Sequence, residues 1–145
     1  MPVRAVPTHD VVVTFERVFG LLRRALPVDD LSLTAASTLH RLDTGGARRL
    51  TELAGLEGVT QPAMTQLVSR LERGGLARRR PDPQDGRVVR VEITQKGRDV
   101  MRRRREVRTR RVNELMASLD ADDRAAIAAA LPALHRLTEL VPPTS

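Results

Sequence analysis

The segment from residue 50 to residue 97 constrains the fold more than any other part of the chain. It reads LTELAGLEGVTQPAMTQLVSRLERGGLARRRPDPQDGRVVRVEITQKG. The spacing of its apolar residues predicts a short helix over 50–56 and a second helix from about 61 to 73. Gly58 lies in the turn between them, and Thr60 is placed to cap the second helix. This pair predicts a helix-turn-helix.

A β-hairpin is predicted directly after the second helix. Gly74 and Gly75 end that helix, and segments 76–80 and 88–93 have strand character. The segment between them, 81–87, combines prolines with a glycine, which is typical of a hairpin loop. The order of elements therefore predicts a winged helix-turn-helix, in which the hairpin is the wing.

Helical spacing also predicts helices on both sides of this segment. They cover 8–26, 34–42, 95–119 and a last stretch from about 123 to 140. Thr94 is placed as the cap of the third of these helices. Residues 43–46 are predicted to form a loop, and Pro132 is expected to kink or split the last helix.

Composition indicates a polyanionic partner. The net charge is +7 with a pI near 11.4, although a solvated basic surface is the alternative explanation. Proteins that bind RNA or single strands usually stack bases on aromatic rings, and here the aromatic residues are limited to Phe15 and Phe19. We therefore expect double-stranded DNA as the partner.

Several other classes of site are disfavoured. Without cysteine there can be no disulfide, thiolate metal ligand or thiol-based sensor. The sequence contains no Gly-rich phosphate loop and no histidine paired with a carboxylate at a useful spacing, so nothing in it suggests an enzyme. We therefore expect no catalytic residue, no cofactor and no metal. No stretch approaches the roughly 20 apolar residues that span a bilayer, and the N-terminus lacks the apolar core of a secretory signal. We expect a cytoplasmic protein.

The predicted fold is mainly α with a small β-hairpin wing (α+β): a winged helix-turn-helix flanked by long dimerisation helices. The first helix and the last two carry broad apolar stripes that one winged lobe cannot cover, so partner helices are needed. We expect residues 8–30 and 99–141 to form a helical dimerisation domain. Residues 31–98 are expected to form the DNA-binding lobe, with 1–7 and 142–145 as flexible ends.

The second helix of the motif supplies the first group of candidate DNA contacts. Its outward residues are Thr60, Gln61, Ala63, Thr65, Gln66, Ser69, Arg70 and Arg73. Recognition helices meet bases mainly through their N-terminal residues, which favours Gln61, Ala63, Thr65 and Gln66 for base edges. Thr60, Ser69 and Arg70 are then favoured for the DNA backbone. The alternative is a polar, solvated helix face.

The wing supplies the second group. Its candidate DNA-binding residues are Arg79, Arg80, Asp85, Arg87 and Arg90. Arg87 follows a glycine at the tip and is expected to enter a minor groove. Asp85 is expected to act structurally, by pairing with Arg87 or a neighbouring arginine. Arg78, Arg79 and Arg80 could instead be solvated charge that protects a sheet edge.

These motifs together resemble the MarR family of transcriptional regulators. The matching residues are Leu33-Thr34, Glu52-Leu53-Ala54, Val59-Thr60-Gln61-Pro62 with Thr65, Leu71-Glu72-Arg73-Gly74-Gly75-Leu76, Arg79-Arg80, Asp82-Pro83, Asp85-Gly86-Arg87 and Thr94-Gln95-Lys96-Gly97. The resemblance implies a homodimer with two winged lobes in successive major grooves of a pseudopalindromic operator. It also implies, commonly, release from DNA when a small molecule binds between the lobes and the dimerisation helices.

The chain departs from some members of that family. It has no reactive cysteine, and His9, His40 and His135 are scattered rather than clustered as zinc ligands. An anionic aromatic effector is common in the family, and a ligand pocket could involve Phe15, Phe19 and His40. Arg17, Arg23 or Arg24 would then supply positive charge. Alternatively, the phenylalanines belong to the dimer core and His40 is an ordinary helix residue.

We therefore expect a sequence-specific regulator of transcription that binds double-stranded DNA, a ligand-responsive repressor acting as a homodimer. An architectural DNA-binding protein of low sequence specificity is the main alternative, because it would share the basic charge. A winged helix used for protein interaction is a further one.

Overall fold

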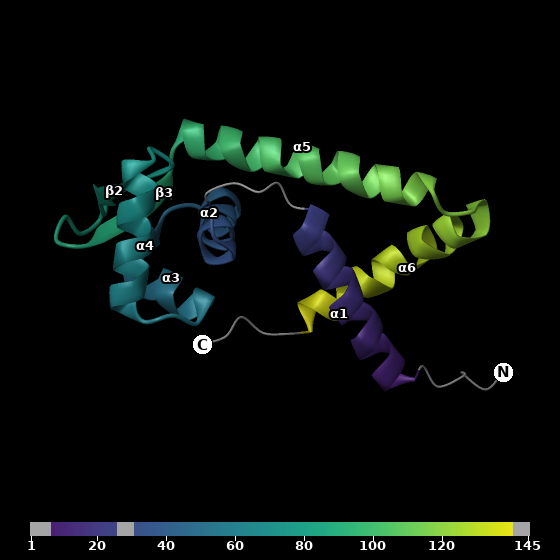
Figure 1. Cartoon of the computed structure of the whole chain (residues 1–145). Helices are drawn as coiled ribbons and strands as arrows, with labels where there is room; N and C mark the ends of the chain where they lie inside the picture. Colours follow the sequence, from purple (N-terminus) through teal and green to yellow (C-terminus); the bar gives the residue numbers. More distant parts are fainter. Residues whose placement is uncertain (1–6, 26–30, 141–145) are drawn as a thin grey trace.

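The computed structural model describes residues 7–25 and 31–140, and within them the predicted fold class is confirmed. The elements are α1 (Thr8–Ala25), α2 (Leu33–Gly45), β1 (Arg48–Arg49), α3 (Leu50–Glu57), α4 (Gln61–Arg73), β2 (Ala77–Pro81), β3 (Val89–Ile93), α5 (Gln95–Ala117) and α6 (Ala121–Glu139). A lobe of α2, α3, α4 and the sheet lies at one end of α5, and α1 and α6 lie towards its other end (Figure 1). The ends predicted to be flexible, except Pro7, fall outside the described residues.

Side-chain caps set the first residues of most of these helices. Thr60 and Thr94 accept hydrogen bonds from the amides of Ala63 and Gly97, at 3.4 and 3.0 Å, as predicted. Ser32 caps α2 and Asp120 caps α6 in the same way. A cap needs only a side-chain acceptor three residues before a free amide, so it depends on local sequence.

Three local expectations differ from the structure. The predicted loop over 43–46 is helical through Gly45, where Thr44 donates a hydrogen bond to the carbonyl oxygen of His40 at 2.9 Å. Pro132 was expected to kink or split α6, and the split is excluded because α6 is continuous around it. A proline removes one i→i−4 hydrogen bond and can leave the rest of a helix in place. The strand β1 was not expected, because its two residues form a strand only by pairing with β3.

The strands form an antiparallel sheet in the order β1-β3-β2. Ala77 pairs with Ile93 and Arg79 with Val91, so these residues share one face of the sheet. That face covers the core, where Val91 and Ile93 are buried. The opposite face carries Arg78, Arg80, Arg90 and Glu92. The hydrophobic core comprises Ala35, Leu39, Leu42, Leu53, Ala54, Met64, Leu67, Val68, Leu71, Ala77, Val91 and Ile93.

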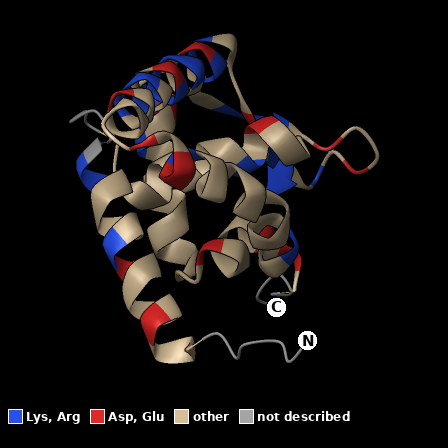
Figure 2. Ribbon diagram, turned by 90° about the vertical axis from the view of Figure 1, so that its right-hand side faces the viewer, with Lys and Arg blue, Asp and Glu red and all other residues tan. Residues whose placement is uncertain are grey.

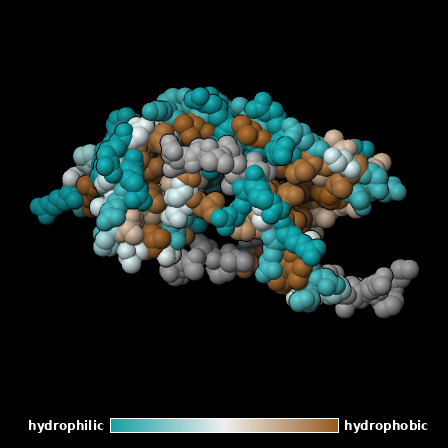
Figure 3. Space-filling view, viewed as in Figure 1, coloured by the Kyte–Doolittle hydropathy of each residue, from teal (hydrophilic) through white to brown (hydrophobic). Residues whose placement is uncertain are grey.

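Helices α1 and α6 contribute no described residue to this core. Large apolar side chains on both are exposed, among them Phe19 at 59% and Leu131 at 48%. Figure 3 shows the resulting apolar surface over α6 and part of α1. In the part of the chain that the structure describes, no helix combines the length and apolar character that crossing a membrane would require.

Candidate nucleic-acid interface

The helix-turn-helix is held by a tight turn between α3 and α4. Gly58 adopts φ 63°, a left-handed conformation that favours glycine, and its amide donates to carbonyl oxygens at the end of α3. The amide of Val59 then donates to the carbonyl oxygen of Ala54 at 3.0 Å. Ala54 and Met64 are buried where the helices pack. The predicted turn at Gly58 is therefore confirmed, and Ala54 and Met64 lie where the two helices pack.

One face of α4 packs on the core and the other is open to solvent. Met64, Leu67, Val68 and Leu71 are buried. The sequence-predicted residues occupy the opposite face: Thr60, Gln61, Ala63, Thr65, Gln66, Arg70 and Arg73 are exposed, and Ser69 is half-buried. The structure thus brings the predicted recognition residues together on one side of a single helix.

The polar groups on this face are not equally free to bind DNA. Thr65 donates its hydroxyl proton to the carbonyl oxygen of Gln61, and Ser69 donates to that of Thr65, both at 2.9 Å. These hydroxyls keep only acceptor capacity. The side-chain amides of Gln61 and Gln66 make no hydrogen bond to another described residue, so both can donate and accept at a base edge.

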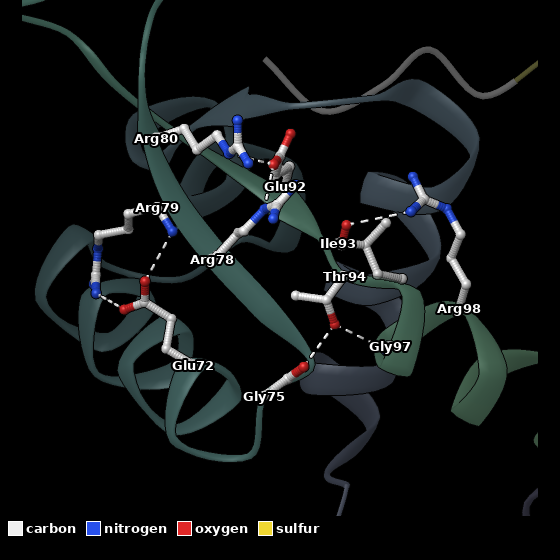
Figure 4. A network of polar contacts seen from close by, with 10 residues as sticks. All are labelled: Glu72, Gly75, Arg78, Arg79, Arg80, Glu92, Ile93, Thr94, Gly97 and Arg98. Atoms are coloured by element: carbon white, nitrogen blue, oxygen red, sulfur yellow. Dashed lines mark hydrogen bonds and ion pairs between the residues drawn. The ribbon is translucent and has the colours of Figure 1, made fainter.

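Most of the wing's arginines are paired with acids. Arg78 and Arg80 both contact Glu92, Arg90 contacts Asp82, and Arg79 contacts Glu72. Figure 4 shows the pairs formed by Glu92 and Glu72, and Figure 2 shows basic and acidic residues interspersed along the chain. The exposed guanidinium of Arg87 has no ion pair with a described residue. The wing's free positive charge is therefore concentrated at its tip.

The tip of the wing is shaped by two aspartates. The carboxylate of Asp85 accepts a hydrogen bond from the backbone amide of Arg87 at 3.1 Å, and the amide of Val88 donates to the Asp85 carbonyl oxygen at 2.9 Å. Asp85 thus has the structural role that we expected. It acts through the backbone, whereas we had expected a side-chain pair with an arginine.

Asp82 is an organising residue that sequence reasoning did not single out. It is buried, and its carboxylate accepts hydrogen bonds from the amide of Gln84 at 2.8 Å and from Arg90. Its own amide donates to the carbonyl oxygen of Val88 at 2.7 Å, which closes the loop. The signal in the sequence was an aspartate between two prolines, because an aspartate in a turn commonly accepts from the backbone amide two residues on.

This environment predicts how the wing responds to acid. The hydrogen bond from the Gln84 amide, followed by the bond and charge of Arg90, lowers the pKa of Asp82 below its ordinary value of 3.8. A lowered pKa in the folded state gives a stabilisation that is present above pH 3.8 and is lost as the pH falls through the lower folded value. In an NMR titration, the Gln84 amide should keep its shift down to about pH 4 and move below it.

The control is Asp82→Asn, whose side chain does not titrate. We expect its Gln84 amide to show no transition in this range. A wild-type transition well above pH 4 would contradict the assigned contacts.

The residues suggested for an effector pocket are not brought together in one hollow. Phe15 and Phe19 lie on α1 and His40 on α2, and all three side chains are exposed. Phe15 lines a hollow of about 290 Å³ between α1 and α6. Pro7, Asp10, Val11, Thr14 and Leu134 are the other residues that line it. His40 and Phe19 are not part of that hollow.

Comparison with known proteins agrees with this geometry. Residues 31–89 match the model of the MarR family. An uncharacterized HTH-type transcriptional regulator of Mycobacterium leprae is 32% identical over 115 residues, which are 79% of this chain and 80% of that protein. An HTH-type transcriptional regulator of Mycobacterium tuberculosis is 31% identical over the same shares of the two chains.

Solved structures extend the similarity to the whole fold. A putative transcriptional regulator from Pseudomonas aeruginosa superposes with a TM-score of 0.79 at 29% identity, covering 92% of this chain and 94% of the other. RV1404 from Mycobacterium tuberculosis superposes with a TM-score of 0.78 at 26% identity, covering 93% and 94%. Both alignments extend well beyond the winged lobe.

Proposed function

Since the chain belongs to the MarR family and is a DNA-binding transcriptional regulator, we propose that it acts as a homodimeric repressor on a pseudopalindromic operator. The observation that carries this proposal is the open face of α4, where the unengaged amides of Gln61 and Gln66 lie on the outward side of the helix-turn-helix. Residues 31–98 form the DNA-binding lobe in this proposal. Residues 8–30 and 99–141 form the dimerisation domain.

Dimerisation is supported by the exposed apolar surface of α1 and α6. These residues are Val12, Phe15, Val18, Phe19 and Leu21 on α1, and Ile127, Leu131, Leu134 and Leu137 on α6. Apolar surface of this extent usually marks an interaction site, and long helices without a packed face are not stable alone. A second copy of the chain offers the same apolar helices, which makes a self-complementary interface.

The contacts divide by chemistry. Gln61, Ala63, Thr65 and Gln66 face base edges in the major groove, and Thr65 contributes there as an acceptor. Thr60, Arg70 and Arg73 contact phosphates, and Arg87 enters the minor groove. The half-sites of the operator should be about one helical turn apart, roughly 34–36 Å.

Release from the operator by a small anionic aromatic molecule is part of the proposal. It is supported by the hollow beside Phe15. Equilibrium binding of salicylate as a probe, with and without operator DNA, tests this part. Equal affinity in the two cases would contradict coupling between the sites.

The principal test uses a duplex that the wild-type protein selects from a random pool. Wild-type protein should prefer it to random duplex of equal length by about a thousandfold or more. An architectural protein of low specificity would show little preference. Arg87→Ala should weaken binding to both duplexes and reduce the slope of log K against log salt by about one for each cation removed.

The matched control is Arg110→Ala, which removes the same charge from the exposed surface of α5, away from the winged lobe. Its salt slope should equal that of the wild type. An unchanged slope for Arg87→Ala would remove the wing tip from the interface.

A further inference from the structure

We propose that Glu72 and Arg79 form a clamp that fixes the recognition helix α4 to strand β2 of the wing. In this assignment Arg79 is a positioning residue that sets which side chains of α4 meet the bases, and it does not contact DNA itself. The inference rests on the proposed role of α4 in reading base edges. It goes further by naming the residue that holds α4 in register.

The clamp consists of contacts from one arginine to three positions on α4. The backbone amide of Arg79 donates to Oε1 of Glu72 at 2.8 Å, and its guanidinium Nη1 donates to Oε2 of the same carboxylate. Nη2 donates to the carbonyl oxygen of Thr65 at 3.3 Å and to Oγ of Ser69 at 3.2 Å. Figure 4 shows the pair between β2 and α4. Both charged side chains are half-buried.

The register of the sheet explains why Arg79 differs from its neighbours. Arg79 pairs with Val91, which is buried, so its side chain leaves the sheet on the core side, where α4 lies. Arg78 and Arg80 leave on the opposite side and contact Glu92. Three consecutive arginines therefore have two different surroundings, and the middle one is directed at the recognition helix.

The contacted positions define what the clamp controls. Residues 65, 69 and 72 follow a spacing of four and three, so they lie along one stripe of α4. Turning α4 about its axis, or sliding it along β2, would break contacts at all three positions together. Gln61 lies on the same stripe, four residues before Thr65, and Gln66 lies beside it. The approach of both side chains to base edges changes with any such movement. The clamp therefore controls base preference.

The clamp also leaves fewer positive charges and hydrogen-bond donors available to bind DNA. The carboxylate of Glu72 neutralises Arg79. Ser69 already donates to Thr65 and accepts from Arg79, so its hydroxyl proton is not free for a phosphate. This assignment replaces the phosphate or groove contacts expected for both residues from the sequence.

Glu72→Gln distinguishes a clamping role of Arg79 from a DNA-binding role, because the two roles predict opposite changes in DNA affinity. The substitution raises the net charge by one and frees the guanidinium. If Arg79 were a DNA cation, binding to every duplex would tighten. As a clamp, the loss of the carboxylate should weaken binding to the selected duplex by about tenfold. Affinity for random duplex should stay the same or rise.

Arg79→Ala and the double variant complete the measurement. Arg79→Ala should lower the preference for the selected duplex by a similar factor, with a salt slope equal to that of the wild type. The double variant should be no worse than either single change, because both remove the same contact. Arg79→Lys should not restore the preference, since an ammonium cannot make the forked contacts of a guanidinium.

A different set of results would overturn the clamp. A salt slope lowered by about one in Arg79→Ala, as for a lost phosphate contact, would place Arg79 on DNA. Tighter binding of Glu72→Gln to the selected duplex would do the same. If Arg79→Ala fails to fold, Glu72→Gln carries the test, because its amide oxygen still accepts from the Arg79 backbone. Gln66→Ala tests the proposed function separately: an unchanged base preference there would contradict the role of α4 and leave the contacts of Arg79 unaffected.

Discussion

Gly97→Ala is expected to destabilise the folded protein by roughly 3 kcal/mol or more, which is a large fraction of the stability of a domain of this size. Gly97 is buried in the first turn of α5, where the helix packs against the start of the wing. A Cβ atom there would lie 2.6 Å from Cγ1 of Ile93 and 3.1 Å from the carbonyl carbon of Leu76. It would lie closer still to the Leu76 carbonyl oxygen. Backbone atoms cannot rotate away, so α5 must shift.

The shift would disturb a junction of three elements. Thr94 caps α5 by accepting a hydrogen bond from the Gly97 amide. Its hydroxyl donates to the carbonyl oxygen of Gly75 at 2.6 Å. Its backbone amide donates to the carbonyl oxygen of Leu76 at 3.0 Å. Figure 4 shows Thr94 between Gly75 and Gly97. Moving α5 would therefore loosen the end of α4 and the start of the wing together.

Thermal unfolding measures the effect, with Gly55→Ala as the matched control. Gly55 lies inside α3 with nothing within 4 Å of the added carbon, so alanine should be neutral or stabilising there. We expect Gly97→Ala to lower the melting temperature by about 10 °C. Equal melting temperatures for the two variants would contradict the close packing of α5 on the wing.

The second large effect is expected from Leu131→Asp, which should dissociate the proposed homodimer. Leu131 is 48% exposed in the single chain, on the same face of α6 as Ile127 and Leu134. A carboxylate at this position should destabilise the monomer little, because the side chain is already in contact with solvent. In a dimer it would be buried against apolar side chains without a partner, at a cost of several kcal/mol.

Loss of the dimer should reduce operator binding by about a hundredfold or more, since two linked lobes bind far more tightly than one. Sedimentation measures the mass, and titration of the selected duplex measures the affinity. Ala129→Asp is the control: it adds the same charge on the opposite side of α6, in line with Asp122 and Arg136. A dimeric Leu131→Asp variant that binds normally would contradict the proposed interface.

The features predicted correctly depend on short stretches of sequence. Thr60 and Thr94 cap helices because the amide that each needs lies three residues ahead. The outward face of α4 was predictable, since buried Met64, Leu67 and Leu71 recur at helical spacing. The turn at Gly58 was predictable because a glycine is favoured at positive φ.

The features that were missed depend on residues far apart in the chain. Strand β1 exists only through its pairing with β3, which lies some forty residues later. The roles of Arg78, Arg79 and Arg80 cannot be separated by composition, since all three are basic and consecutive. The loop over 43–46 was predicted from local composition, and that prediction was wrong for residues 43–45, which continue α2. Asp43 there pairs with Arg98 of α5 at 3.4 Å, a contact that local composition does not reveal.

The sequence by itself determined the order of the helices and of the two wing strands, the outward face of α4 and the family of the protein, because periodicity, caps and turns act within a few residues. Only the tertiary structure decided which charges remain free. The pairing of β2 with β3 directs Arg79 to Glu72, and the closure of the wing loop directs Arg90 to Asp82. The physical reason is that an arginine is free to bind DNA only when no acidic side chain lies close enough to pair with it. The register of the sheet determines which acidic side chain lies close to each arginine.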